Sequence, residues 1–215
     1  MNKFTIENTK VWGLENSVRA SGNPMRTEIE QEFDENAFKR LLKLANTGVG
    51  EGHDQALTGC IVQCDLYAPL YMWKQIQRYH FLDFISSQST MHRLLKFDVS
   101  QCCVEETDPI ILERYRELVE EYQRNKQELE DFKNKSGTTK TTLELIKEML
   151  DNKWRTLVAS LPCGFVLGAT MTTNYRQLKT IYQQRKNHKL KEWHEFCSWI
   201  EKLPHSELIT GVKNG

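Results

Sequence analysis

The segment Ala68–Arg93 constrains the fold more than any other part of the chain. It opens with an Ala-Pro pair and continues through closely spaced aromatic and aliphatic residues. Proline is tolerated in the first turn of a helix, and the apolar residues then recur at helical spacing. We therefore predict a buried helix from about Pro69 to Phe84.

The end of this segment is rich in polar side chains that a core helix does not require. The predicted helix would bring Gln75, Arg78 and His80 to one wall of a site, and the SSQST stretch would form a second wall. Clustered hydroxyl and amide groups can bind an anion or a polar base, but they also occur in ordinary loops. The residues alone leave both interpretations open.

Length and composition narrow the class of protein. A chain of 215 residues with 39% hydrophobic and 27% charged residues fits one globular domain, residues 1–215. No run approaches the roughly 18 apolar residues of a membrane span, and the N-terminus lacks a signal-peptide pattern, so we expect a cytoplasmic protein without a membrane partner. The chain has 29 Lys and Arg residues and 29 Asp and Glu residues, so its formal net charge is zero. It therefore has no overall positive field that would attract nucleic acid.

The six cysteines do not form the CxxC pairs of structural zinc sites. In the cytoplasm they would stay reduced, and free cysteines are commonly just buried. Cys60 and Cys64 alternate with apolar neighbours in a β-branched stretch, Thr58–Leu66, that predicts a buried strand. We therefore expect no metal site.

Other stretches predict further strands and helices. Residues 4–12 suggest a first strand pair, and Glu32–Ala45 has helical spacing with Asp34 or Asn36 as a possible N-cap. Phe165–Thr173 predicts a strand that leads into a helix, and Leu190–Lys202 predicts the last helix. The loop TGVGEGHD carries His53 but lacks the spacing of a phosphate-binding loop.

Two long amphipathic patterns follow one another in the middle of the chain. Apolar residues mark one face of a helix from about Asp108 to Asn134, KSGTTK forms a turn, and a second helix follows. The simplest interpretation is an antiparallel hairpin, at about 108–157, with a solvated charged face, although it could also bind a partner. The fold class is therefore α+β, a mixed sheet with long helices and a helical hairpin insertion.

Three segments resemble, in order, the flavin-dependent thymidylate synthase family. GHDQALTGCIVQCDLYAPLYMWKQIQRYH is similar to the family's Gly-His loop, strand and Ala-Pro helix, and the Ser-rich continuation extends through Ser89. Leu161–Arg185 is similar to the family's Leu-Pro, strand, Thr-x-Asn-x-Arg-x-Leu and helix pattern without a gap. The match covers about half of the chain and most resembles short, divergent members such as those of phages.

The resemblance implies an enzyme that uses FAD, NADPH and methylenetetrahydrofolate to methylate C5 of dUMP, giving dTMP. It also implies a homotetramer with shared active sites in the cytoplasm of a bacterial or phage-infected cell. Carried over position by position, the substrate-binding residues are Gln75, Arg78, Ser87, Gln88, Ser89 and Arg185, and the cofactor-binding residues are His53, Gln55, Arg78, Tyr79, His80, Asn174, Arg176 and Thr180.

Arg185 is the residue to which the resemblance assigns the catalytic role. It would pair with the uracil edge and favour the N3-ionised form of the base. A fixed guanidinium can stabilise developing negative charge in a dry site, and lysine cannot copy its planar fork.

The chain departs from the family pattern at several positions. The family's Arg-His-Arg corresponds to Arg78–His80 counted from the Ala-Pro pair, or to Tyr79–Phe81 counted back from Ser89. In either register at least one flavin-binding arginine is absent. Val158 stands where the family has a phosphate-binding arginine, with Arg155 one turn away, and Thr58-Gly59 replaces a Glu-His pair.

Two charged contacts to phosphates are worth a few kcal/mol, so these departures leave other functions open. One alternative keeps the fold and changes the reaction to methylation or hydroxymethylation of dCMP. Another is a nucleotide-binding or assembly protein that has lost the flavin, with the helical hairpin serving a partner.

Overall fold

The computed structural model describes residues 4–29, 35–48, 51–134 and 139–211. The chain divides into two compact units. The sheet unit comprises Phe4–Ala68, Met72–Ser87 and residues 168–211. The hairpin unit comprises Pro69–Tyr71 and Gln88–Leu167.

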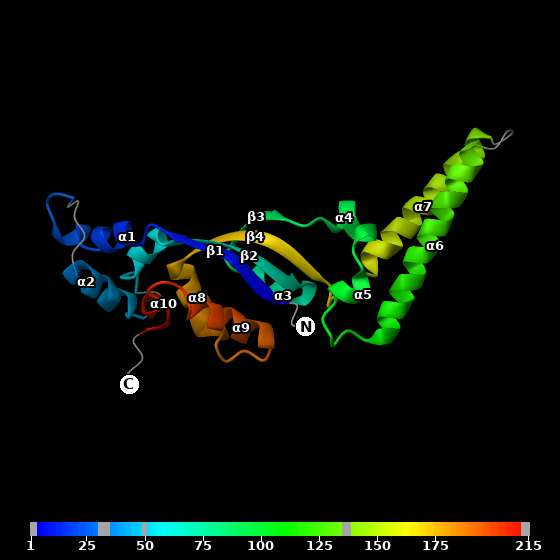
Figure 1. Cartoon of the computed structure of the whole chain (residues 1–215). Coiled ribbons are helices and arrows are strands. Elements are labelled where there is room, and N and C mark those ends of the chain that lie inside the picture. Colours follow the sequence, from blue (N-terminus) through cyan, green and yellow to red (C-terminus); the bar gives the residue numbers. More distant parts are fainter. Residues whose placement is uncertain (1–3, 30–34, 49–50, 135–138, 212–215) are drawn as a thin grey trace. The chain divides into compact units, whose positions relative to one another are not determined.

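A four-stranded sheet runs in the order β1-β2-β4-β3 (Figure 1). Its strands are β1 (Thr5–Trp12), β2 (Ile61–Pro69), β3 (Asp83–Ser87) and β4 (Val166–Asn174). β1 pairs antiparallel with β2, and β3 pairs antiparallel with β4. The amide of Tyr175, just after β4, donates to the carbonyl of Cys60, just before β2, which makes the central pair antiparallel as well. The sheet is thus antiparallel throughout rather than mixed in direction.

The two central strands bury alternate residues, as the period of two of a strand requires. In β2 the buried residues are Val62, Cys64, Leu66 and Ala68, while in β4 they include Ala169, Met171 and Thr173. The predicted strands at Thr58–Leu66 and Phe165–Thr173 are confirmed with slightly shifted ends, and both cysteines are buried. The predicted first strand pair is a single strand, whose register shifts near Asn8 because this residue has a φ of 50°.

Helices complete the sheet unit. They are α1 (Leu14–Ala20), α2 (Glu35–Ala45), α8 (Tyr175–Arg185), α9 (Lys191–Ile200) and α10 (Glu207–Thr210), and α8 packs on α9 and α10 (Figure 1). The predicted helix that ends at Ala45 is confirmed from Glu35 onward. Asn36 lies inside this helix and is not its N-cap, and Asp34 lies outside the described residues.

The predicted helix from Pro69 to Phe84 is wrong in its second half. Helix α3 (Leu70–Ile76) ends early, Phe81 adopts a left-handed φ of 61°, and the chain then enters β3. The pairing of Phe84 with Met171 and of Ser87 with Ala169 gives this backbone its hydrogen bonds. Pairing with a strand far away in sequence therefore overrides the local helical pattern.

The hairpin unit is built on α6 (Pro109–Asn134) and α7 (Lys140–Ala159), which run side by side in opposite directions (Figure 1). The rings of Tyr122 and Trp154 pack 5.6 Å apart, and the hydroxyl of Tyr115 donates to the carbonyl of Leu157. The short helices α4 (Thr90–Arg93) and α5 (Val99–Cys102) complete the unit. The predicted helices are confirmed, while residues 135–138 of the predicted turn lie outside the described part.

The α+β class with long helices is confirmed by these elements. Within the described ranges, no helix has both the length and the apolar character required to cross a bilayer.

Candidate functional site

Arg185, at the C-terminal end of α8, is held in place by hydrogen bonds and aromatic rings of the sheet unit. Its Nε donates to the hydroxyl of Tyr79 at 2.6 Å, and its Nη1 donates to Oε1 of Gln75 at 3.3 Å. The guanidinium carbon lies 4.7 Å from the ring centre of Trp193 and 5.4 Å from that of Tyr79. Contacts of this kind with a cation contribute roughly 0.5–2 kcal/mol each.

Trp193 connects this cluster to α9. Its ring is fully buried, and its indole N–H donates to the same Oε1 of Gln75 that accepts from Arg185, at 3.0 Å. The hydroxyl of Tyr79 donates in turn to Gln184 at 3.0 Å. We call Gln75, Tyr79, Arg185 and Trp193 the Arg185 cluster.

A second cluster of charges lies at the start of α8. Asp54 and Lys179 are each only 3% exposed, and Lys179 Nζ donates to the Asp54 carboxylate at 2.8 Å and to the carbonyl of Thr47 at 2.9 Å. Arg176 Nε donates to the other carboxylate oxygen at 2.9 Å. The two cations thus tie the loop that carries His53 to α8. We call Asp54, Arg176 and Lys179 the Asp54 cluster.

The charges of the Asp54 cluster compensate one another. Burial alone would raise the pKa of Asp54, but hydrogen bonds and charge from Lys179 and Arg176 outweigh burial and keep this pKa below its usual value. Asp54 is therefore ionised at neutral pH and acts as the counterion of both cations. Nothing in this arrangement resembles a poised general base.

A basic pocket of about 560 Å³ lies in the hairpin unit. Its lining residues are Gln88, Ser89, His92, Arg93, Lys96 and Phe97. This volume lies within the range of about 300–1,000 Å³ that is typical of ligand sites. Arg93 and Lys96 are exposed, their side chains form no ion pair with a described residue, and no carboxylate lines the pocket. Such a pocket can bind a phosphate group by charge and hydrogen bonding.

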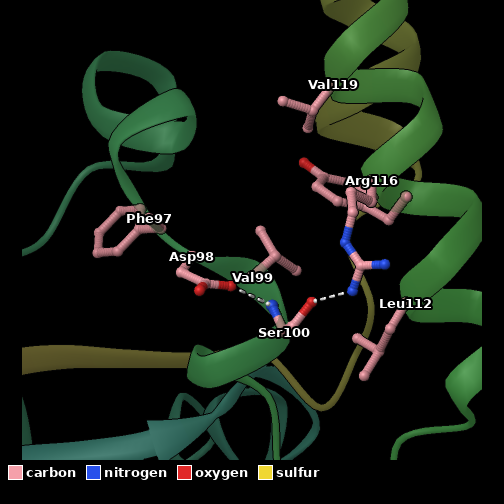
Figure 2. A pocket seen from close by; sticks show the side chains of 8 residues that line it. Phe97, Asp98, Val99, Ser100, Leu112, Arg116 and Val119 are labelled. Carbon is pink, nitrogen blue, oxygen red and sulfur yellow. Dashed lines mark hydrogen bonds between the residues drawn. The ribbon is translucent and has the colours of Figure 1, made fainter.

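A smaller pocket of about 120 Å³ lies between α5 and α6 (Figure 2). Figure 2 shows Ser100 between its two partners: Arg116 donates to the Ser100 hydroxyl at 3.1 Å, and the Asp98 carboxylate accepts from the Ser100 amide at 3.1 Å. The pocket is too small for a nucleotide, and its polar groups already bind one another. We assign no ligand to it.

The structure brings some of the predicted site residues together and separates others. Gln75, Tyr79 and Arg185 lie in one cluster, and Arg176 lies in the Asp54 cluster. Because an α-helix rises about 1.5 Å per residue, Arg176 and Arg185 are about 14 Å apart along α8. Gln88 and Ser89 line the pocket of the hairpin unit.

The remaining predicted residues divide into exposed and internally bonded side chains. His53, Gln55, Arg78, His80 and Ser87 are exposed. Asn174 is buried, and its Oδ1 accepts from the Gln177 amide as the N-cap of α8. The hydroxyl of Thr180 donates to the Arg176 carbonyl, four residues back in the helix.

Sequence reasoning missed several residues that shape these sites. Trp193 lies within the last predicted helix, Leu190–Lys202, and the sequence did not connect it with Arg185, which it supports. Lys179 was not predicted at all, and its position one helical turn after the apolar Tyr175 was the available signal. The basic spacing of His92, Arg93 and Lys96 could have indicated the pocket.

Comparison with known proteins gives matches only at the level of structure. No model of a protein family and no curated protein matches the sequence. Two structures of the flavin-dependent thymidylate synthase ThyX from Helicobacter pylori, both with FAD and dUMP, match with a TM-score of 0.66 and 12% identity. They cover 95% and 96% of this chain and 97% of the other chain.

A third match is the UMP/dUMP methylase PolB from Streptomyces cacaoi bound with 5-Br dUMP. Its TM-score is 0.53 at 13% identity, and the match covers 92% of this chain and 88% of the other. The first two matches span nearly the whole of both chains. This chain therefore has the fold of the flavin-dependent thymidylate synthases.

Proposed function

We propose that this protein is an enzyme that methylates C5 of dUMP, giving dTMP. The observation that carries the proposal is the basic pocket at Gln88 and Ser89, because the resemblance assigns these residues to the nucleotide independently of any structure. Arg93 and Lys96 supply the positive charge that a nucleotide phosphate requires, and His92 lines the same pocket. The solved proteins of this fold bind dUMP or a brominated dUMP, which supports the same ligand class.

Arg185 is the proposed catalytic residue. Its guanidinium is fixed by Tyr79 and Gln75 before any ligand binds, so it needs no reorganisation when negative charge develops on the uracil ring. The ring of Trp193 behind it keeps water away from one face. Both features suit stabilisation of the N3-ionised base.

The proposed cofactors are FAD, NADPH and methylenetetrahydrofolate. Three of the proposed cofactor-binding side chains, Arg78, His53 and His80, are exposed and form no ion pair with a described residue. Their N–H groups are therefore available to bind an anionic dinucleotide such as FAD. Asn174 and Thr180 are engaged inside the fold, and Arg176 offers only the part of its guanidinium that Asp54 leaves free. When bound, FAD reduced by NADPH supplies the electrons, and methylenetetrahydrofolate supplies the carbon.

The proposed assembly is a homotetramer with shared active sites. β3 is an edge strand whose five residues are all exposed, and these include Phe84 at 42% and Ile85 at 52%. Exposed apolar residues on an unpaired edge are typical of surfaces that another chain covers. A second copy of this protein is the occupant that the proposed function requires.

The test is to incubate the purified protein with dUMP and the three cofactors and to measure dTMP by mass spectrometry. Arg185→Ala should lower turnover by about 100- to 1,000-fold and leave the flavin absorption band unchanged. Arg124→Ala, an exposed arginine on α6, is the matched control and should keep full activity.

The products also separate the other candidate functions. If the products are methylated or hydroxymethylated dCMP, the protein keeps the fold but acts on a different pyrimidine nucleotide. A protein that stays colourless at saturating FAD, yet binds nucleotide, would be a flavin-free nucleotide-binding protein. If Arg185→Ala keeps full turnover, Arg185 has no catalytic role in the reaction.

A further inference from the structure

One exposed side of α7 carries no charge, although the helix as a whole is highly charged. Seven of its 20 residues are Lys, Arg, Asp or Glu. The uncharged side chains recur at steps of three or four along this side, and all of them are exposed: Thr141, Leu145, Met149, Asn152 and Thr156. Because residues three and four apart are neighbours on a helix, they form a continuous strip about 22 Å long.

The apolar part of this strip lies next to α6. Leu145 is 62% exposed and Met149 is 40% exposed. Both precede Lys153 in steps of four, and Lys153 donates to the carboxylate of Glu121 on α6 at 3.3 Å. Phe132 is also exposed and lies on the same side of α6 as Glu121, because eleven residues make about three helical turns. We call the surface formed by Phe132, Leu145 and Met149 the hairpin face.

Carboxylates border the hairpin face on both helices. Glu128 on α6 and Glu148 on α7 are exposed and form no ion pair with a described residue. Glu144 adds a third carboxylate, which lies 3.8 Å from the ammonium group of Lys140. Lys153, at the end of the apolar row, is already bound to α6. The hairpin face is therefore apolar in its centre and negative at its border.

We propose that the hairpin face is a docking surface for an amphipathic helix of another protein that carries Lys or Arg beside its apolar row. Apolar side chains three and four apart on such a helix would bury Leu145 and Met149, and its cations would lie opposite the glutamates. A strip of about 22 Å matches a helix of about 15 residues. This proposal does not depend on the proposed function.

The charge of the hairpin face argues against a second copy of this chain as the occupant. In a twofold contact the same surface meets itself. Glu128 and Glu148 of one copy would then lie against the same carboxylates of the other, and like charges across an interface repel. A basic partner removes this repulsion and gains attraction instead.

The probe for this surface is a fluorescein-labelled synthetic peptide of about 15 residues, with Leu and Lys at the spacing of an amphipathic helix. Its binding to the full chain is measured by fluorescence anisotropy, beside that of a peptide in which Glu replaces every Lys. We expect the Leu/Lys peptide to bind at least about tenfold more tightly than the Leu/Glu peptide. The difference should shrink when the ionic strength rises from about 0.05 M to about 0.5 M, because salt screens exposed charges.

A first pair of variants tests the apolar centre. Leu145→Ser combined with Met149→Ser should weaken binding of the Leu/Lys peptide at least about tenfold, because both side chains would be buried by the partner. Ile110→Ser combined with Ile111→Ser removes two exposed apolar side chains at the other end of α6 and should leave binding unchanged.

A second pair of variants tests the negative border. Glu128→Gln combined with Glu148→Gln should weaken the Leu/Lys peptide and make its binding less dependent on salt. Glu15→Gln combined with Glu28→Gln makes the same change in net charge at exposed positions of the sheet unit and should have no effect.

Three outcomes would overturn the proposal. If Leu145→Ser with Met149→Ser binds the Leu/Lys peptide as tightly as the wild type does, the peptide responds only to negative charge. If the wild type binds neither peptide, the hairpin face does not accept a helix. If light scattering gives this double variant a smaller mass than the wild type, a second copy covers the face. Should circular dichroism show that the double variant does not fold, the glutamate variants decide. No step of this test involves turnover, so its result is independent of the dTMP assay.

Discussion

Asp54 is a buried carboxylate with a cation on each oxygen, and its removal would leave Lys179 charged without a counterion in the interior. Breaking a buried ion pair on one side costs about 3–5 kcal/mol. We expect Asp54→Asn to lower the free energy of unfolding by about 3 kcal/mol in urea titrations at pH 7. Asp54→Asn combined with Lys179→Met should recover part of this loss, because the unpaired charge is gone.

The same residue makes stability depend on pH in the acid range. Since its pKa in the folded protein lies below the usual value, Asp54 contributes stability above about pH 4, and the contribution is lost as the pH falls through the lowered pKa. The urea midpoint of Asp54→Asn should therefore fall less between pH 5 and pH 3 than that of the wild type. Asp151→Asn, on the exposed face of α7, is the control. Equal pH profiles for wild type and Asp54→Asn would contradict this assignment.

At the scale of elements, α8 carries residues of the Asp54 cluster near its start and Arg185 at its end. Its first turn is capped by Asn174. Asn174 Oδ1 accepts from the Gln177 amide at 2.9 Å, which satisfies one of the free N–H groups at the helix start. Asn174→Ala should cost about 1 kcal/mol of unfolding free energy, and Asn174→Asp should restore most of it, because aspartate also caps and complements the helix dipole. If Asn174→Ala has wild-type stability, the residue does not act as the cap.

The end of α3 shows how one element can be redirected by another. One further turn follows the end of α3 at Ile76: the Tyr79 amide donates to the Ile76 carbonyl, and the Tyr79 hydroxyl accepts from Arg185. Had the helix continued to Phe84, Arg78 and His80 would have followed the helical period. The exposed polar groups after α3 are thus placed by the pairing of β3 with β4.

At the scale of the whole molecule, the exposed edge strand β3 provides a test of the proposed assembly. Ile85→Lys puts a charge on this edge, where a packed interface would have to bury it. We expect light scattering coupled to gel filtration to give a smaller mass for Ile85→Lys than for the wild type. Ile110→Lys, the same change at a 78% exposed residue of α6, should leave the mass unchanged. A wild-type monomer would contradict the proposed homotetramer.

The sequence by itself determined the elements whose signals are local. The alternation of Val62, Cys64 and Leu66 predicts a strand, and the long amphipathic patterns predict α6 and α7, because side chains repeat with the period of the backbone. It also suggested Arg185, Gln75, Gln88 and Ser89 as site residues, through a resemblance that the fold supports.

Only the tertiary structure decided how these elements meet. It ended α3 at Ile76 and made β3 from a helical pattern, since backbone pairing with β4 is not encoded in local periodicity. It also brought Trp193 against Arg185 and Lys179 against Asp54, over long separations in sequence. Such contacts depend on the packing of whole elements, so the orientation of Gln75 between Trp193 and Arg185 follows from the tertiary structure and not from the sequence pattern.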